Sequence, residues 1–258
     1  MTIERILQNE AKLHRDFFGE KFDLTEFEAA LQKYGEEKVR RWNALGLEPH
    51  FLPEITMSRE TEFPGWKVKP EEWLYLKVKE GKILRQRFDG ELQVDHKAFA
   101  LEGVTVLVDT RLKPTHKEDK QMWADDHLFL GPIMERLRDE KRITENYYGL
   151  QSSRFDVSID EWADEIRPAV ADFLGFGRSQ IRLERAIEMN VIPQLYPHMP
   201  RKDDLATDRG FSWIWLEEHF AVRANRLVGG QFYYGGFAFV FWPDALRSYG
   251  CFRPLAVI

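Results

Sequence analysis

The hydrophobic positions near the start of the chain recur at the spacing of amphipathic helices. This pattern predicts helices over residues 2–18 and 24–45. Thr25 is followed three residues later by Glu28, which indicates a capping box at the start of the second helix. Gly46 is placed to end this helix, because glycine readily adopts the left-handed conformation that closes helices. Residues 1–65 are therefore interpreted as an N-terminal helical segment.

The pattern then changes to short apolar stretches. Residues 49–70 contain four prolines and are predicted to form a loop. Strands are predicted at residues 73–78, 84–88 and 103–109. Residues 111–126 are polar and are expected to form a surface loop. Residues 128–141 carry apolar side chains at helical spacing and predict a further helix.

The second half begins with a clear helix-start signal. Ser158 is followed by Glu161, and the helix is expected to run to about Leu174, where glycines end it. Residues 181–191 are predicted to be helical or mixed, and prolines mark a loop at residues 193–200. Residues 213–215 alternate like a strand, and residues 216–222 that follow have a helical composition.

Residues 226–258 combine glycine pairs with alternating aromatic residues. Gly229-Gly230 and Gly235-Gly236 flank a short aromatic stretch, and residues 237–241 then alternate like a strand. Ala238 and Val240 share one face of this strand, and three phenylalanines share the other. The face with small and β-branched residues suits a packed interior. The phenylalanine face is then either a second buried layer or a binding surface.

Composition and charge restrict the class of protein. A chain of 258 residues with 43% hydrophobic and 31% charged residues is typical of one or two globular domains. The net charge of -6 argues against a nucleic-acid partner. No apolar run approaches the roughly 20 residues of a membrane span, so none is predicted. The N-terminus lacks a signal-peptide pattern, which predicts a location in the cytoplasm or on a phage particle.

Few residues carry a catalytic or metal-binding pattern. His116 and Asp125-Asp126-His127 contain metal-binding residue types, but their spacing fits no compact metal site, and a helix start is the favoured interpretation. Gly175-Phe176-Gly177 follows a helix rather than a strand, which favours a helix stop over a nucleotide loop. The single cysteine, Cys251, precludes an intrachain disulfide and is interpreted as buried and unreactive. The sequence therefore predicts no catalytic residue, no metal and no cofactor.

Several motifs resemble those of a known protein family. They are Arg226-Leu227-Val228-Gly229-Gly230, Gly235-Gly236 and Phe252-Arg253-Pro254-Leu255. They are similar to the C-type-lectin-fold branch shared by formylglycine-generating enzymes and the variable proteins of diversity-generating retroelements. Upstream, the helix from Asp160 and the segment Trp213-Ile214-Trp215-Leu216-Glu217 resemble elements of the same fold. Glu184 and Cys251 depart from the family, which often has proline and glycine there. The resemblance covers about residues 100–258.

This resemblance implies an α+β C-type lectin fold, with small antiparallel sheets and two helices, over residues 66–258 and a variable region at about residues 226–254. In the retroelement branch, a reverse transcriptase misreads adenines in a template, and the altered copy replaces the end of the target gene. The scaffold positions implied here are Arg226, Leu227, Gly229, Gly230, Gly235, Gly236, Ala238, Val240, Phe252, Arg253 and Pro254. The variable, ligand-binding positions implied are Gln231, Phe232, Tyr233, Tyr234, Phe237, Phe239, Phe241, Trp242, Asp244, Leu246, Arg247, Ser248 and Tyr249.

The resemblance and the aromatic content together predict a non-catalytic, receptor-type binding protein. Tyrosine provides a large contact area at a low cost in entropy. The expected partner is a protein or a cell-surface molecule. One alternative is a fixed phage or cell-surface structural or adhesion protein with the same fold. Another is an oxidase of the formylglycine-generating type, which the single cysteine disfavours because that chemistry in the family depends on a cysteine pair and copper.

Overall fold

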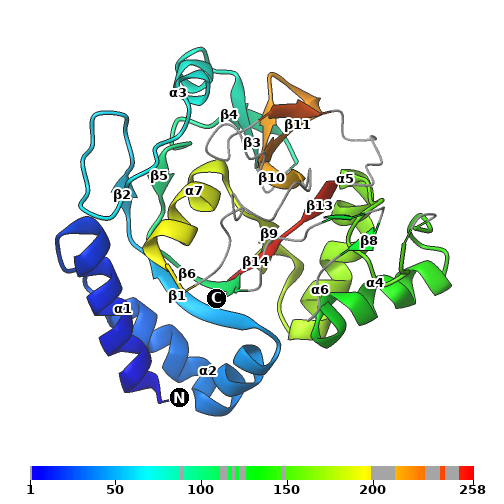
Figure 1. The fold of residues 1–258 in the computed structure, drawn as a ribbon, viewed down its shortest axis with the longest axis horizontal. Coiled ribbons are helices and arrows are strands. Elements are labelled where there is room, and N and C mark those ends of the chain that lie inside the picture. The colour runs from blue at the N-terminus through cyan, green and yellow to red at the C-terminus, as the bar shows by residue number, and fades with distance from the viewer. Residues whose placement is uncertain are drawn as a thin grey trace.

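The fold combines helices with small β-sheets in an α+β arrangement (Figure 1). The computed structural model describes residues 2–87, 90–110, 116–117, 120–121, 126–146, 149–198, 213–229, 239–241 and 250–258. Most neighbouring strands pair antiparallel, and the pair β10–β13 is parallel. The coarse α+β prediction is confirmed.

The central sheet joins strands from distant parts of the sequence. It contains β1 (Leu47–Leu52), β6 (Val104–Asp109), β14 (Pro254–Val257) and β9 (Ile181–Leu183), in the order β1-β6-β14-β9. All three pairings are antiparallel, with Leu47 opposite Asp109 and Ala256 opposite Leu107. Strand β1 belongs to the predicted helical segment of residues 1–65. Backbone hydrogen bonds between β1 and β6 therefore cross the predicted boundary at residue 65.

The two N-terminal helices form where the hydrophobic pattern predicts them. They are α1 (Ile3–Phe18) and α2 (Thr25–Ala44). Gly19 ends α1 in the left-handed conformation, at φ 79°. The predicted capping box of α2 is wrong, because Thr25 is the first helical residue and its hydroxyl donates to Asp23 at 2.6 Å. Gly46 follows the end of α2 and donates its N–H to Asn43, as predicted in outline.

Two predictions for residues 47–79 are wrong in part. The predicted loop at residues 49–70 contains β1 and β2 (Ile55–Thr56), which pairs with β5 (Ala100–Leu101). Proline is tolerated in β1 because this strand is at the edge of its sheet. The predicted strand at residues 73–78 is the helix α3 (Glu72–Lys79). Its aromatic side chains contact different parts of the fold, because Trp73 stacks on Phe220 and Tyr75 stacks on Phe99.

A second, six-stranded sheet carries the C-terminal motifs. Its members are β3 (Ile83–Gln86), β4 (Leu92–Val94), β10 (Trp213–Phe220), β11 (Val222–Gly229), β12 (Phe239–Phe241) and β13 (Gly250–Phe252). Strand β10 is central, because it pairs with β11, β3 and β13. The helical prediction for residues 216–222 is therefore wrong. Pairing with three strands outweighs the helical propensity of Leu216, Glu217 and Glu218.

The remaining helices are short. They are η1 (Asp126–Leu128), α4 (Leu130–Asp139), α5 (Ile159–Glu161), η2 (Trp162–Ile166), α6 (Arg167–Leu174), η3 (Arg178–Gln180) and α7 (Ala186–Leu195). Strands β7 (His116–Lys117) and β8 (Lys120–Gln121) form a small hairpin. The predicted loop from residue 193 begins later, because α7 continues to Leu195. Pro193 costs a single hydrogen bond in its last turn.

The helix predicted to begin at Ser158 is confirmed, together with its capping box. The Ser158 hydroxyl accepts the N–H of Glu161, and the Glu161 carboxylate accepts the N–H of Ser158 at 2.8 Å. A wider, π-helical turn follows over η2, in which Arg167 donates to the carbonyl of Trp162. The next residue, Pro168, has no N–H to donate, which favours this interruption of regular α-helical bonding.

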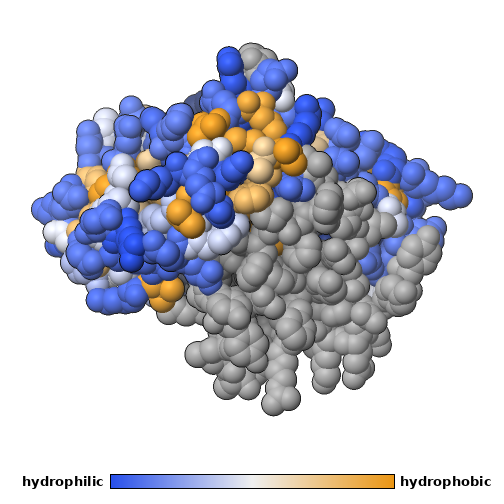
Figure 2. All heavy atoms as spheres, turned by 90° about the horizontal axis from the view of Figure 1, so that it is seen from above, coloured by the Kyte–Doolittle hydropathy of each residue, from blue (hydrophilic) through white to orange (hydrophobic). Residues whose placement is uncertain are grey.

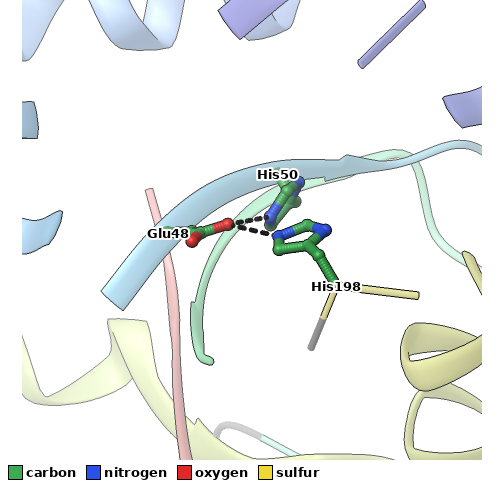
Figure 3. Close-up of side chains that lie close together, drawn as sticks. All are labelled: Glu48, His50 and His198. Atoms are coloured by element: carbon green, nitrogen blue, oxygen red, sulfur yellow. Dashed lines mark hydrogen bonds and ion pairs between the residues drawn. The ribbon is translucent and has the colours of Figure 1, made fainter. Parts of the chain in front are cut away.

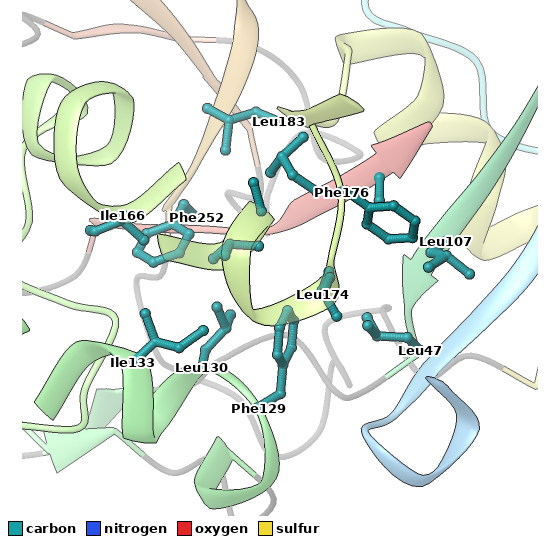
Figure 4. Packing of buried hydrophobic residues seen from close by; sticks show 14 of the residues in the cluster. Leu47, Leu107, Phe129, Leu130, Ile133, Ile166, Leu174, Phe176, Leu183 and Phe252 are labelled. Atoms are coloured by element: carbon teal, nitrogen blue, oxygen red, sulfur yellow. The ribbon is translucent and has the colours of Figure 1, made fainter. Parts of the chain in front are cut away.

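The main hydrophobic core brings these elements together. Figure 4 shows side chains from β1, β6, α4, η2, α6, β9 and β13 converging in one cluster. Phe252 of β13 is fully buried and lies against Trp162, with ring centroids 4.9 Å apart. Each such buried side chain contributes roughly 1.5 to 3 kcal/mol. The end of the sequence is thus a structural part of the core.

The surface is mostly hydrophilic around the end of the molecule that carries α3. Figure 2 looks onto this end and shows hydrophobic side chains gathered near its centre, with smaller separate hydrophobic spots among hydrophilic neighbours. Exposed large apolar side chains of the described residues include Leu76 of α3 and Val222 of β11.

The capping box gives a first testable prediction. Ser158→Ala removes the side-chain acceptor for the Glu161 N–H and should lower the free energy of unfolding by about 1 kcal/mol. Urea denaturation measures this change. Ser179→Ala is the matched control, because Ser179 is exposed, and it should leave stability nearly unchanged. Equal losses in the two variants would contradict a stabilising role for the cap.

Candidate functional site

The predicted ligand-binding residues lie mainly outside the part of the chain that the structure describes. Phe239 and Phe241 have a described backbone, in β12. Gln231, Phe232, Tyr233, Tyr234, Phe237, Trp242, Asp244, Leu246, Arg247, Ser248 and Tyr249 lie outside the described residues. Strand β12 pairs antiparallel with β11, so that Phe241 is opposite Arg226 and Phe239 is opposite Val228. The binding surface itself stays a prediction.

The predicted scaffold positions on either side are buried where they are described. Leu227 and Phe252 are fully buried, and Arg226 and Arg253 are nearly so. The Arg226 guanidinium donates to the backbone carbonyls of Leu216 and Glu217 on β10. Gly230, Gly235, Gly236 and Ala238 lie outside the described residues, and the side chain of Val240 is not described. The described scaffold residues thus anchor β11 and β13 in the fold.

Both anchor strands pair with the same end of β10. Gly229, the last residue of β11, is opposite Ile214, and Gly250, the first residue of β13, is opposite Trp213. Strands in a sheet are about 4.8 Å apart. The two ends of the segment 230–249 are therefore roughly 10 Å apart, on either side of one strand.

A network of buried charges fixes α7 and β9 against β10. Arg185 forms an ion pair with Asp95 at 3.1 Å and donates to the carbonyls of Lys97 and Ala100. Its Nε lies 3.8 Å from Glu218, whose carboxylate accepts the N–H of Ala186. Burial raises the pKa of Glu218 more than Arg185 lowers it, and Asp95 raises it further, to about 7. This network positions the strand on which both anchors rest.

A second buried network lies at the opposite end of the sequence, on α1. Glu10 is 1% exposed, and its carboxylate accepts hydrogen bonds from the Phe51 N–H at 2.8 Å and from the Tyr196 hydroxyl at 2.7 Å. Nδ1 of His50 donates to the other Glu10 oxygen at 2.8 Å, and His14 lies 3.4 Å from the carboxylate. Burial raises the pKa of Glu10, but the charge of His50 and the hydrogen bonds of both histidines lower it to about 2.

His50 connects this network to a second carboxylate, Glu48, and a third histidine, His198. Its Nε2 is 3.3 Å from Oε2 of Glu48, and Nε2 of His198 is 2.8 Å from the same oxygen (Figure 3). Burial lowers the pKa of His50, but the charge and hydrogen bond of Glu10, followed by those of Glu48, raise it to about 9. Glu48, His50 and His198 are residue types that bind metal ions, and they form such a group in the described part of the chain.

The sequence contains one signal for this cluster, which the prediction missed. Glu48 and His50 are two residues apart, so their side chains share a face once the segment is a strand. The prolines of residues 49–70 favoured a loop instead. His198 is 150 positions from Glu48, and only the tertiary fold brings them together.

The structure gives less support for a metal-binding or catalytic role of the other candidate residues. His127 is exposed, and Asp126 begins η1, in agreement with the predicted helix start near α4. Asp125 and the side chains of His116 and Cys251 are not described. Gly175 has a left-handed conformation at φ 71° and ends α6, as the sequence predicts.

Comparison with known proteins gives no relative from which a function can be transferred. No protein-family model matches the chain, and neither does any curated protein or any solved structure. Within the described residues, no helix has the length and apolar character that crossing a membrane requires.

The buried charge network predicts a specific pH dependence of stability. Glu218 has an ordinary pKa of 4.5 when unfolded and about 7 when folded, so the folded state binds its proton more tightly. The contribution of this group to the free energy of unfolding therefore falls as the pH rises through this interval. Glu218→Gln keeps an acceptor for the Ala186 N–H but cannot titrate.

Urea denaturation at about pH 5 and about pH 8 tests this expectation. The unaltered protein should lose more stability across the interval than Glu218→Gln. Glu20→Gln is the control, because Glu20 is exposed, and it should behave like the unaltered protein. Parallel pH profiles for the unaltered protein and Glu218→Gln would contradict the assignment.

Proposed function

We propose that this protein is a non-catalytic, receptor-type binding protein of C-type lectin fold. Its segment 226–254 carries the ligand-binding surface, and a retroelement diversifies the codons of that surface. The observation that carries the proposal is the common anchoring of β11 and β13 on β10. A segment whose two ends are held on either side of one strand can change its side chains while those ends stay fixed.

The burial of the flanking residues supports this division of roles. Val228 and Phe252 pack into the same main core cluster, and Arg226 is bonded to the backbone of β10. The described side-chain interactions of these anchor residues come from outside the segment 230–249, whereas β12, within it, adds backbone pairing with β11. Substitution within that segment leaves those interactions in place, which is the requirement for a surface that tolerates many sequences.

The composition of the segment supports binding rather than catalysis. Its tyrosines, phenylalanines and tryptophan are residue types enriched in protein interfaces, and tyrosine and tryptophan are also frequent in binding hot spots. Glycine pairs on both sides of residues 231–234 permit backbone conformations that other residues avoid. A diversified surface needs such adaptable contacts. A catalytic site, in contrast, needs fixed groups at fixed distances.

The principal alternative is a fixed structural or adhesion protein with the same fold. The two functions differ at the level of the gene. A diversified gene requires a near-copy of the codons for residues 226–254, beside a reverse-transcriptase gene. The copy should differ from the gene only where the template carries adenine. Sequencing the surrounding DNA decides between them, because the absence of both elements would leave only the fixed protein.

The division between anchors and binding residues predicts contrasting effects on stability. The combined variant with Tyr233, Tyr234, Phe239 and Trp242 changed to Ala should keep a melting temperature close to that of the unaltered protein. Phe252→Ala creates a cavity in the core and should lower the free energy of unfolding by about 3 to 5 kcal/mol. Calorimetry or circular dichroism measures both. A large loss in the combined variant would show that these aromatic residues are core and would contradict the proposal.

A further inference from the structure

We propose that Glu48, His50 and His198 form a binding site for one zinc ion. One ligand atom of each residue lies within 4.8 Å of the other two. In Figure 3 both imidazole rings face a carboxylate oxygen of Glu48, from strand β1 and from the segment after α7. Two histidines and one glutamate are a set of zinc ligands found in proteins, with a fourth position left for water or another ligand.

The hydrogen bond between His50 and Glu10 supports this assignment. Nδ1 of His50 donates to Glu10 at 2.8 Å, so Nε2 is the nitrogen that faces Glu48. Histidines that bind metals usually donate their other ring N–H to a carboxylate, a backbone carbonyl or water, which fixes the ring and strengthens the ligand. Glu10 is itself held by Phe51 and Tyr196. The hydrogen bonds that would hold His50 in position as a metal ligand are therefore already present.

Histidines are the partners of both carboxylates in the cluster. In the described part of the chain, Glu10 is paired with His14 and His50, and Glu48 is paired with His50 and His198. No described lysine or arginine is paired with either carboxylate. A zinc ion would replace the hydrogen bonds from His50 and His198 to Glu48 and would displace no described lysine or arginine.

Access and ligand chemistry determine which ion fits. The side chains of His198 and Glu48 are 45% and 30% exposed, whereas His50 is buried. An ion can therefore reach the cluster from the side of His198, where the fourth position faces solvent. Calcium and magnesium prefer oxygen ligands, whereas imidazole suits zinc. The site would join α1, β1 and the end of α7 and is independent of the proposed binding surface on the other sheet.

The test is a calorimetric titration of the full chain with zinc chloride, after removal of metal by a chelator and without a polyhistidine tag. The unaltered protein should bind one zinc ion. His198→Ala and Glu48→Gln should abolish this binding, and circular dichroism should show that both variants remain folded.

Glu10→Gln should weaken binding about 10- to 100-fold, as the loss of a supporting partner does. His96→Ala is the matched control, because His96 is exposed and lies outside the cluster, and it should bind like the unaltered protein.

Two results would overturn the proposal. One is the absence of zinc binding, or equal binding by the unaltered protein and His198→Ala. The other comes from X-ray absorption at the zinc edge. A zinc–sulfur distance of about 2.3 Å would place the ion on Cys251 instead, whereas two imidazoles and a carboxylate oxygen at about 2.0 to 2.2 Å would support the cluster.

Discussion

The antiparallel pairing of β14 between β6 and β9 is the constraint on which the remaining structure depends. Strand β6 pairs with β1 on its other side, so this one interaction joins elements from both ends of the sequence. Leu255 and Ala256 of β14 are buried, in different hydrophobic clusters. The strand therefore contributes side chains to both faces of the sheet. The helices on each side pack against a surface that exists only when β14 is in place.

Buried arginines connect this sheet to the irregular segments around it. Arg138 of α4 donates to the carbonyls of Thr144, Ser153 and Phe155, and so organises the chain between α4 and α5. Arg154 pairs with Asp109 at the end of β6 and also bonds the Phe252 carbonyl. A guanidinium has five donors in a fixed plane, which suits it to carbonyls that no strand or helix satisfies. Loss of such a group leaves several buried acceptors without partners, at a cost of about 1 to 3 kcal/mol each.

Sequence patterns were most informative where local signals agree with the tertiary fold. Long apolar periodicity predicted α1, α2 and α4, and the Ser158 cap predicted the start of α5. Predictions failed where local preference and packing conflict. Residues 73–78 form a short apolar stretch that predicted a strand, yet they lie in a helix in which Trp73 and Tyr75 stack on different partners. Residues 216–222 have helical composition, yet most of them lie in a strand that pairs with three others.

The carboxylate–histidine cluster could be predicted only in part, for the same reason. The spacing of Glu48 and His50 places them on one face, but only if the segment is a strand. That assignment depends on β1 pairing with β6, more than 50 residues later in the sequence. Glu10 and His14 lie on the buried face of α1, where polar residues among apolar ones indicate a buried polar network. The partners of that network are set by tertiary contacts alone.

The position of β14 has a consequence for how altered genes are expressed. A stop codon or frameshift anywhere between residues 226 and 253 removes β14 and leaves β6 and β9 with unpaired edges. Such edges promote aggregation. Truncated chains would therefore be recognised as misfolded and degraded instead of accumulating. Only those gene copies whose reading frame is intact through residue 257 would yield a folded product. Folding would therefore select against copies in which a frameshift or a stop codon precedes β14.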